Sequence, residues 1–295
     1  MYRYFFMAFL CCVALAGIKP SFAQQEPIRV IVIGAHPDDC DIDAGGTAIL
    51  FARMGHKVKF LSVTNGDAGH HEIGGGMLAK RRMAEAGEAG RRFGVEYEVL
   101  DNHDGELLPT LEIRKEIIRR IRQWNADVVI AHRPNDYHPD HRYTAMLVQD
   151  AAYMVIVPNV APDTPPLAKN PVFLYSSDRF QKPDPFEPDI VVDVSEVWDQ
   201  KIYAMAAHES QFFEWLPWTN GTLAEVPTNE ADRLKWLSAW RGQEITDQIR
   251  DALVFWYGEE RARTVRHVEA FEICEYGRQP GREEINRLFP MIRKP

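Results

Sequence analysis

The first half of the chain alternates short apolar runs with longer amphipathic segments, and this alternation constrains the fold more than any other feature. Residues 28–34 (IRVIVIG) are mostly β-branched and predict a strand that is buried on both faces. Further strands are expected at 57–63, 96–100 and 127–131, and helices at 44–54, 78–93, 111–124 and 141–157. This order predicts an α/β fold, a three-layer sandwich in which helices cover both faces of a mostly parallel sheet.

The second half of the chain differs from the first in its composition and in its pattern of expected elements. A proline-rich stretch at 158–188 is expected to be an ordered loop around a strand at 172–176. A strand at 190–194 and a helix at 197–210 should follow, and the remainder contains Trp215, Trp218, Trp236, Trp240 and Trp256. Tryptophans ordinarily pack in cores, and the alternative is that some line a sugar-binding cleft. We expect a single catalytic domain at 24–295, with its core at about 27–211 and a Trp-rich C-terminal elaboration at about 212–295.

The N-terminal residues have the pattern of a secretory signal peptide. Arg3 precedes an uncharged apolar run at 5–18, and Ser21 and Ala23 form a small-x-small end. The apolar run is shorter than the about 20 residues that a membrane-spanning helix needs. We therefore predict a signal peptide at 1–23 and a periplasmic or secreted protein without stable membrane insertion; an uncleaved anchor is the alternative.

Charge and cysteine content narrow the classes of partner. The formal net charge is −9 and the chain has no run of Lys and Arg, so nucleic acid is an unsuitable partner. Only Cys40 and Cys274 follow the predicted leader, and two cysteines do not form a disulfide framework. We expect both to be unpaired, with a single disulfide between them as the alternative. The oligomeric state cannot be derived from these features.

Two polar clusters follow two of the expected strands. One contains His36, Asp38 and Asp39, and the other contains His138 and His141, three residues apart at the start of a helix. In open parallel sheets ligands bind beyond the carboxyl ends of the strands, so a strand order of 3-2-1-4 would bring the two clusters together. This placement indicates a shared functional site.

The residue types in these clusters suit a metal-dependent hydrolase. Two histidines and one carboxylate leave a metal ion with an open position for water, whose pKa the metal lowers. A second carboxylate can then accept the proton from that water, and a further histidine can stabilise the oxyanion or protonate the leaving nitrogen.

The motifs themselves resemble those of a known family. Gly34-Ala35-His36-Pro37-Asp38-Asp39 with Gly45-Gly46-Thr47, followed by His138-Pro139-Asp140-His141, is similar to the PIG-L/LmbE family of zinc-dependent N-deacetylases. The resemblance covers most of residues 28–211. It implies a Rossmann-like fold and removal of acetyl groups from N-acetylglucosamine conjugates.

The resemblance also implies roles for the five polar residues. His36, Asp39 and His141 would bind one zinc ion per chain, with ferrous iron as the runner-up metal. Asp38 would act as the general base, and His138 would stabilise or protonate the tetrahedral intermediate.

Three further positions resemble substrate contacts of that family. These are Arg82, in Arg82-x-x-Glu85; Asp104, in Asp104-Gly105; and His208, in His208-x-Ser210-Gln211. The chain departs from the family at Cys40, where glutamate is common. That position is not a metal ligand in the family, but a thiol beside zinc could alter the site.

A glycine-rich loop lies between the second expected strand and the helix that follows it. His70, His71 and Glu72 precede the glycines at 74–76, and the loop is predicted to be a mobile lid over the site. A second metal bound by His70 or His71, or a substrate contact there, is the alternative.

These observations together predict an exported zinc-dependent hydrolase that removes the N-acetyl group from an N-acetylglucosamine-type amino sugar or its conjugate. Its partner would be a small-molecule or glycan substrate. Hydrolysis of another sugar-linked amide is the first alternative. A non-catalytic carbohydrate-binding protein would require loss of a ligand or of the base. A nucleotide-binding role is disfavoured because the first turn lacks a G-x-G-x-x-G motif.

Overall fold

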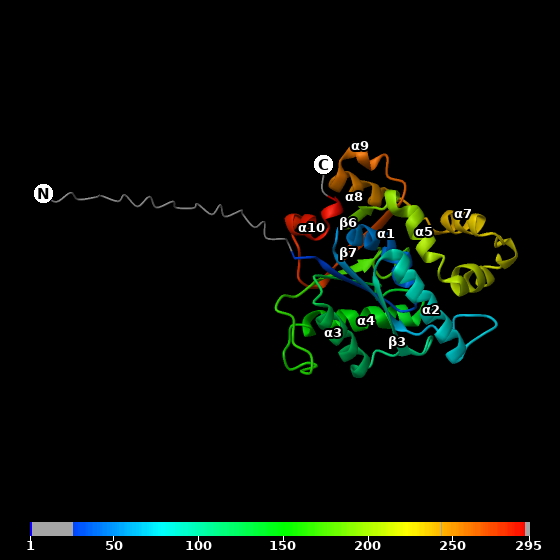
Figure 1. Ribbon diagram of the computed structural model, residues 1–295, viewed down its shortest axis with the longest axis horizontal. Coiled ribbons are helices and arrows are strands. Elements are labelled where there is room, and N and C mark those ends of the chain that lie inside the picture. Colours follow the sequence, from blue (N-terminus) through cyan, green and yellow to red (C-terminus); the bar gives the residue numbers. More distant parts are fainter. Residues whose placement is uncertain (2–25, 243, 293–295) are drawn as a thin grey trace.

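The computed structural model describes residues 1, 26–242 and 244–292 (Figure 1). Apart from Met1, the predicted signal peptide at 1–23 lies outside the described residues. Within the described ranges, no helix combines the length and the apolar character that crossing a membrane requires.

A mixed sheet forms the centre of the described molecule, in the strand order β3-β2-β1-β4-β5-β7-β6. The strands are β1 (Arg29–Gly34), β2 (Lys57–Thr64), β3 (Glu96–Asn102), β4 (Val128–Ala131), β5 (Val172–Ser176), β6 (Ile190–Asp193) and β7 (Val268–Gly277). The first five strands are parallel, and β7 runs antiparallel to both β5 and β6. The predicted α/β fold with a mostly parallel sheet is confirmed, and so is the order 3-2-1-4.

Helices cover both faces of the sheet (Figure 1). One layer contains α1 (Asp39–Arg53), α2 (Gly75–Phe93) and α5 (Trp198–Met205), and the other contains α3 (Leu111–Trp124) and α4 (Pro139–Met154). Val30 and Val32 belong to the first core, whereas Ile31 and Ile33 belong to the second. Successive side chains of a strand point to opposite faces, so a strand covered on both sides is apolar throughout.

The C-terminal region adds short elements and one strand of the sheet. It contains a π-helix (Ser210–Trp215), α6 (Leu216–Thr219), α7 (Glu230–Arg241), α8 (Asp247–Tyr257), α9 (Glu259–Ala262) and α10 (Arg282–Leu288). The 3-10 turns of the described residues are Ser195–Val197, Leu223–Glu225 and Pro290–Ile292. β7 lies between β5 and β6, so the sheet is completed by residues from the predicted elaboration.

The start of α1 differs from the prediction in a way that matters for the site. The helix begins at Asp39 rather than at Ala44, and its first turn contains Asp39 and Asp41. Carboxylates are stabilised near a helix N-terminus by the partial positive charge of the exposed backbone amides. Asp38 and Asp39 are thus fixed by the helix instead of lying on a loop before it.

The Gly45-Gly46-Thr47 motif has a packing role. A Cβ atom on Gly46 would lie 2.7 Å from Cβ of Val194, so only glycine allows this close approach. The backbone amides of Gly46 and Thr47 donate to the buried carboxylate of Glu269 at 2.8 and 2.7 Å, and Lys201 also donates to it, at 2.7 Å. These contacts tie α1 to β7.

Cys40 and Cys274 are both free and buried, as expected. The Cys40 thiol donates to the carbonyl oxygen of Val32 at 3.3 Å, and burial raises its pKa well above the ordinary thiol value. Its sulfur therefore packs against β1 and does not line the pocket described below.

Candidate active site

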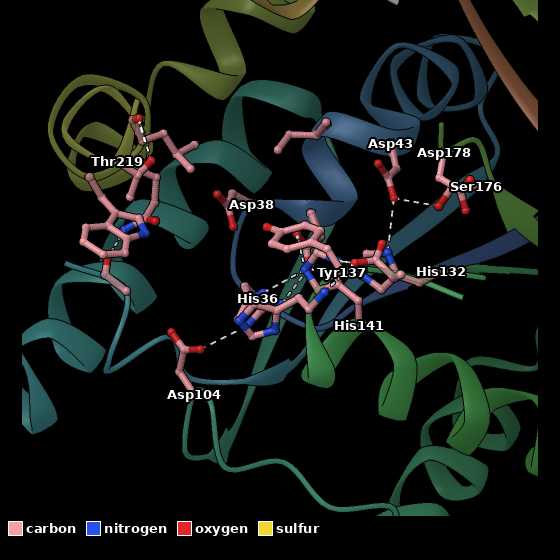
Figure 2. Close-up of a pocket in the computed structure, with 18 of the residues that line it drawn as sticks. His36, Asp38, Asp43, Asp104, His132, Tyr137, His141, Ser176, Asp178 and Thr219 are labelled. Carbon is pink, nitrogen blue, oxygen red and sulfur yellow. Dashed lines mark hydrogen bonds and ion pairs between the residues drawn. The ribbon is translucent and has the colours of Figure 1, made fainter. Parts of the chain in front are cut away.

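A pocket of about 540 Å³ opens where the carboxyl ends of β1 and β4 meet. Figure 2 shows His36 and His141 near its centre, Asp43 and Asp178 on one side, and Thr219 on the other. Residues from both predicted polar clusters, from the glycine-rich loop and from the C-terminal region line it.

The three predicted metal ligands lie close to one another in this pocket. Nδ1 of His36 lies 3.2 Å from Nε2 of His141 and 3.4 Å from Oδ2 of Asp39. Nε2 of His141 lies 3.5 Å from Oδ1 of Asp39. A tetrahedral zinc ion about 2.1 Å from each ligand keeps its ligand atoms about 3.4 Å apart. The donor set therefore fits a zinc ion in both chemistry and spacing.

In each of the two histidines, the ring nitrogen that does not face the other proposed ligands lies close to a carboxylate. Nε2 of His36 lies 3.0 Å from Oδ1 of Asp104, and Nδ1 of His141 lies 3.1 Å from Oδ1 of Asp136. Such carboxylates orient metal-binding histidines and increase their basicity. Asp136 was not predicted, and the sequence signal for it was its place two residues before the candidate His138, in the segment that follows β4.

Local hydrogen bonds explain why these short sequences adopt this geometry. The amides of Asp38 and Asp39 donate to the carbonyl oxygen of His36 at 2.9 and 3.2 Å, which closes a tight turn after β1. The His36 amide in turn donates to Oδ2 of Asp39 at 2.7 Å. In the other cluster, Pro139 occupies the first turn of α4, and His138 is its N-cap.

Other combinations of these side chains could also hold an ion. Among the described residues, the candidate groups are His36 with His138 and His141, Asp39 with His132 and His141, and His36 with Asp104 and Asp140. All lie in the same pocket region and share His36 or His141, so they indicate one cluster with several possible ligand sets.

His132 is a member of this cluster that sequence reasoning missed. Its ring stacks on that of His141 with centroids 4.3 Å apart, and its Nε2 lies 3.2 Å from Oδ2 of Asp39. Burial alone would raise the pKa of Asp39, but His141 and His132 hold it well below the usual value. The position of His132 directly after β4 was the available signal.

Asp38 is paired with Arg82. Nη2 of Arg82 donates to Oδ1 of Asp38 at 2.9 Å and to the carbonyl oxygen of Pro37 at 3.1 Å. Burial raises the pKa of Asp38 above the usual carboxyl value, and Arg82 only partly counteracts this. Arg82 was predicted to contact substrate; it lines the pocket, but its guanidinium is 98 % buried behind Asp38 and holds that carboxylate in place.

His138 lies edge-on to His36, with ring centroids 4.6 Å apart. Its Nδ1 accepts from the Asp140 amide at 3.2 Å, so a neutral ring carries its proton on Nε2. Burial lowers the pKa of His138, and the neighbouring His36 and His141 lower it further. The neutral form is therefore favoured.

The predicted substrate contact of His208 is wrong. Its side chain is fully buried, does not line the pocket, and pairs through Nε2 with Oδ1 of Asp41 at 3.0 Å. The predicted helix at 197–210 ends at Met205, and the chain then forms the π-helix. That π-helix turns Gln211 into the pocket instead, where it donates to the carbonyl oxygen of Gly69 at 3.1 Å.

The glycine-rich loop rests on the C-terminal region. Nε2 of His70 lies 2.8 Å from Oε2 of Glu214, and the ring of His71 stacks on Trp218 at 5.1 Å. Glu72 is exposed and does not line the pocket, whereas Gly69 does. No candidate metal group within the described residues includes His70 or His71.

The fold is an α/β sandwich, and its pocket contains a histidine–carboxylate cluster of the kind that can hold a catalytic metal. The PIG-L family, described as GlcNAc-PI de-N-acetylase, matches residues 31–152. A diacetylchitobiose deacetylase of Thermococcus kodakarensis is 34% identical over an alignment of 218 residues that covers 68% of this chain and 78% of that protein. The chain belongs to the PIG-L family and is a hydrolase of the N-deacetylase type.

Two further relatives extend this finding. A protein of Bacillus cereus named as a probable N-acetyl-alpha-D-glucosaminyl L-malate deacetylase is 29% identical over 71% of this chain and 94% of its own length. The N,N'-diacetylchitobiose deacetylase structure from Pyrococcus horikoshii superposes with a TM-score of 0.63 at 26% identity, covering 84% of each chain.

Proposed function

We propose that this enzyme hydrolyses the N-acetyl group of an N-acetylglucosamine-type amino sugar or its conjugate, with a zinc ion held by His36, Asp39 and His141. The convergence of these three donors, each histidine backed by a carboxylate, is the observation that carries the proposal. The comparisons support the proposal, because relatives named as deacetylases of acetylated sugars cover two thirds or more of the chain.

Zinc, when bound, supplies a Lewis acid that polarises the amide carbonyl and acidifies water. Asp38 is the residue that receives the proton of the attacking water. Arg82 engages Oδ1 of Asp38, so Oδ2 is the oxygen that remains for this proton. The pKa of Asp38, raised by burial, makes its carboxylate a stronger base than an exposed aspartate.

His138 acts on the opposite side of the scissile amide. With Nδ1 occupied by the Asp140 amide, its Nε2–H can donate a hydrogen bond to the carbonyl oxygen as negative charge develops there. Its proximity to His36 places this donor beside the proposed metal ligands. The proton taken up by Asp38 then leaves with the amine product.

The pocket also has features that suit a sugar. Asp104 and Gly105 line it beside His36, and Trp215 lines it from the π-helix. An aromatic face and a carboxylate that accepts hydroxyl hydrogen bonds are common in ligand sites. Asp104 therefore has two roles in this proposal: it orients His36 through Oδ1 and contacts a sugar hydroxyl through Oδ2.

The test is to incubate purified protein with a panel of N-acetylated sugars and other sugar-linked amides and to quantify released acetate or amine. We expect acetate release from N-acetylglucosamine compounds, about one zinc per chain by elemental analysis, and loss of turnover with a chelator. Turnover by chelator-treated, metal-free protein would refute a catalytic metal. Release of a different acid from a different amide would favour the alternative substrate.

We further propose that the enzyme is exported, on the strength of the N-terminal pattern of Arg3, the apolar run and Ser21-x-Ala23. Expression of the full chain in a Gram-negative host should give a product that begins at Gln24 by mass spectrometry. A product that retains Met1 and stays with the cells would contradict export as a freely diffusing protein.

A further inference from the structure

We propose that Arg241 recognises an anionic group, and that the preferred substrate therefore carries a carboxylate or phosphate in addition to its N-acetyl group. This inference rests on the proposed deacetylase function and names the chemical class of its substrate. It starts from a cation in the pocket that the catalytic proposal does not use.

Arg241 reaches the pocket from the C-terminal region. It is the last residue of α7, yet its side chain lines the same pocket as the histidine cluster. The centre of its guanidinium lies 3.9 Å from the centroid of the Trp240 ring and 5.2 Å from that of Phe212. These rings fix the position of the cation against one side of the pocket.

The other arginines that line the pocket have carboxylate partners. Arg82 contacts Asp38 at 2.9 Å, and Arg133 contacts Asp178 at 3.0 Å. Within the described part of the chain, Arg241 forms no ion pair, and its buried Nε has no hydrogen-bond partner. A buried N–H donor without an acceptor costs free energy, and such groups are normally paired. The side chain of Arg241 as a whole is partly exposed to the pocket, so the terminal N–H groups of its guanidinium are the ones that a ligand would contact.

Arg241 lines the same pocket as the proposed reacting centre, but no carboxylate among the described residues contacts it. Burial lowers the pKa of its guanidinium to about 10, and the charge of Asp38 is the largest effect in the opposite direction, followed by those of Tyr137 and Asp43. Arg241 is therefore cationic at neutral pH. It interacts electrostatically with Asp38 and Asp43, although it contacts neither of them.

The chemistry of guanidinium narrows the ligand. A guanidinium that stacks by its face on an aromatic ring keeps its in-plane N–H groups free, and these match the two oxygens of a carboxylate or phosphate. A sugar hydroxyl offers only a single neutral oxygen. The Bacillus cereus relative is named for a malate conjugate, which is one substrate of the inferred anionic class.

The experiment compares three substrates with each of four proteins. The substrates are neutral N,N'-diacetylchitobiose, the carboxylate-bearing N-acetylglucosaminyl malate, and phosphate-bearing N-acetylglucosamine 6-phosphate. The proteins are the wild type, Arg241→Gln, Arg241→Lys, and Lys235→Gln as a matched control. Lys235 is exposed on the same helix and does not line this pocket, so its change removes one positive charge at the surface only.

We expect Arg241→Gln to lower the ratio of kcat/KM for at least one anionic substrate to kcat/KM for the neutral substrate about 10- to 100-fold, mainly through KM. The kinetic effect of Arg241→Lys should lie between the wild type and Arg241→Gln, because lysine keeps the positive charge but lacks the planar guanidinium. Lys235→Gln should match the wild type. Which anionic substrate responds tells carboxylate recognition from phosphate recognition. Thermal melting of all four proteins checks that they are equally folded.

Other outcomes overturn the inference. Equal KM increases for neutral and anionic substrates, or a loss of kcat for all, would show that Arg241 supports the site in general. Wild-type turnover of diacetylchitobiose alone would refute an anionic substrate and leave the deacetylase proposal standing. Failure of the wild type on every N-acetylated substrate would refute the deacetylase proposal, and with it the inference.

Discussion

The two sides of the pocket are built differently. The strand-end wall, residues 36–39 and 132–141 after β1 and β4, contains histidine and aspartate side chains that lie 3.1–3.5 Å from one another. The C-terminal wall, which includes Gln211, Trp215 and Arg241, is mostly uncharged and contains a cation without a carboxylate partner among the described residues. The first wall contains the proposed metal ligands and base, and the second contains a cation that the catalytic proposal does not use. We infer that the first performs the chemistry and the second selects the substrate.

The strongest test of this division removes a metal ligand. Asp39→Ala deletes one of the three converging donors and the carboxylate that His132 contacts, so metal content and turnover should both fall to background. Zinc per chain and acetate release are measured on the same sample. Asp232→Ala, which removes an exposed carboxylate on α7, serves as the control. An Asp39→Ala protein that keeps its zinc and its activity would remove the basis for the proposed ligand set.

Within the same wall, Asp38→Asn should distinguish the role of a general base from that of a metal ligand. The amide keeps the shape of the side chain but cannot accept a proton, so kcat should fall about 10²- to 10⁴-fold while zinc content stays near that of the wild type. Loss of zinc in Asp38→Asn together with retention in Asp39→Ala would reverse the two roles. Full activity of Asp38→Asn would mean that another residue is the base.

His138 gives the next smaller effect and resolves an ambiguity in the cluster. Its ring can be grouped with His36 and His141 as a ligand set, whereas the proposal assigns it to the oxyanion. His138→Ala should retain zinc and lose about 10²- to 10³-fold in kcat, as expected for removal of an oxyanion donor. Loss of zinc with His138→Ala would place this residue among the ligands instead.

The strand-end wall could be predicted from the sequence because its geometry is local. A short apolar run fixes the strand, and the chemistry lies within the ten residues that follow it, so periodicity and fold topology bring His36 and His141 together. Even there, Asp136 and His132 were passed over. Their roles depend on which nitrogen of His141 faces which carboxylate, and spacing alone does not reveal that.

The C-terminal wall could not be predicted, because it depends on contacts between distant segments. The π-helix brings Gln211 into the pocket, whereas the predicted contact His208 is buried before it, and no hydrophobic period indicates such a local change in helical pitch. β7 pairs with β5 across about a hundred residues, and its polar Glu269 binds α1 instead of following the apolar pattern of a strand. Arg241 enters the pocket only because α7 packs near the π-helix, with Trp240 and Phe212 beside its guanidinium.

The smallest expected effect concerns the loop at 66–77, which lies between the two walls. His70, His71, Trp218 and Trp215 form a continuous ring stack, with successive centroids 4.7, 5.1 and 5.3 Å apart. One stacked aromatic pair contributes about 0.5–1.5 kcal/mol. This free energy corresponds to roughly a 2- to 10-fold change in the equilibrium constant between the closed and the open loop. Trp218→Ala should therefore raise KM a few-fold, with kcat nearly unchanged.

Limited proteolysis provides a readout that does not depend on turnover. Glu72 is exposed in this loop, so a glutamate-specific protease should release a fragment ending there, and the fragment can be followed by mass spectrometry. Cleavage should be faster in Trp218→Ala than in the wild type, and slower in the wild type when a substrate analogue is bound, because the analogue favours the closed loop. Phe255→Ala, which removes another exposed aromatic ring far from the loop in sequence and outside the pocket, should leave the rate unchanged. If neither Trp218→Ala nor the analogue alters cleavage at Glu72, the loop is a static part of the C-terminal wall, and substrate selection depends on the fixed residues alone.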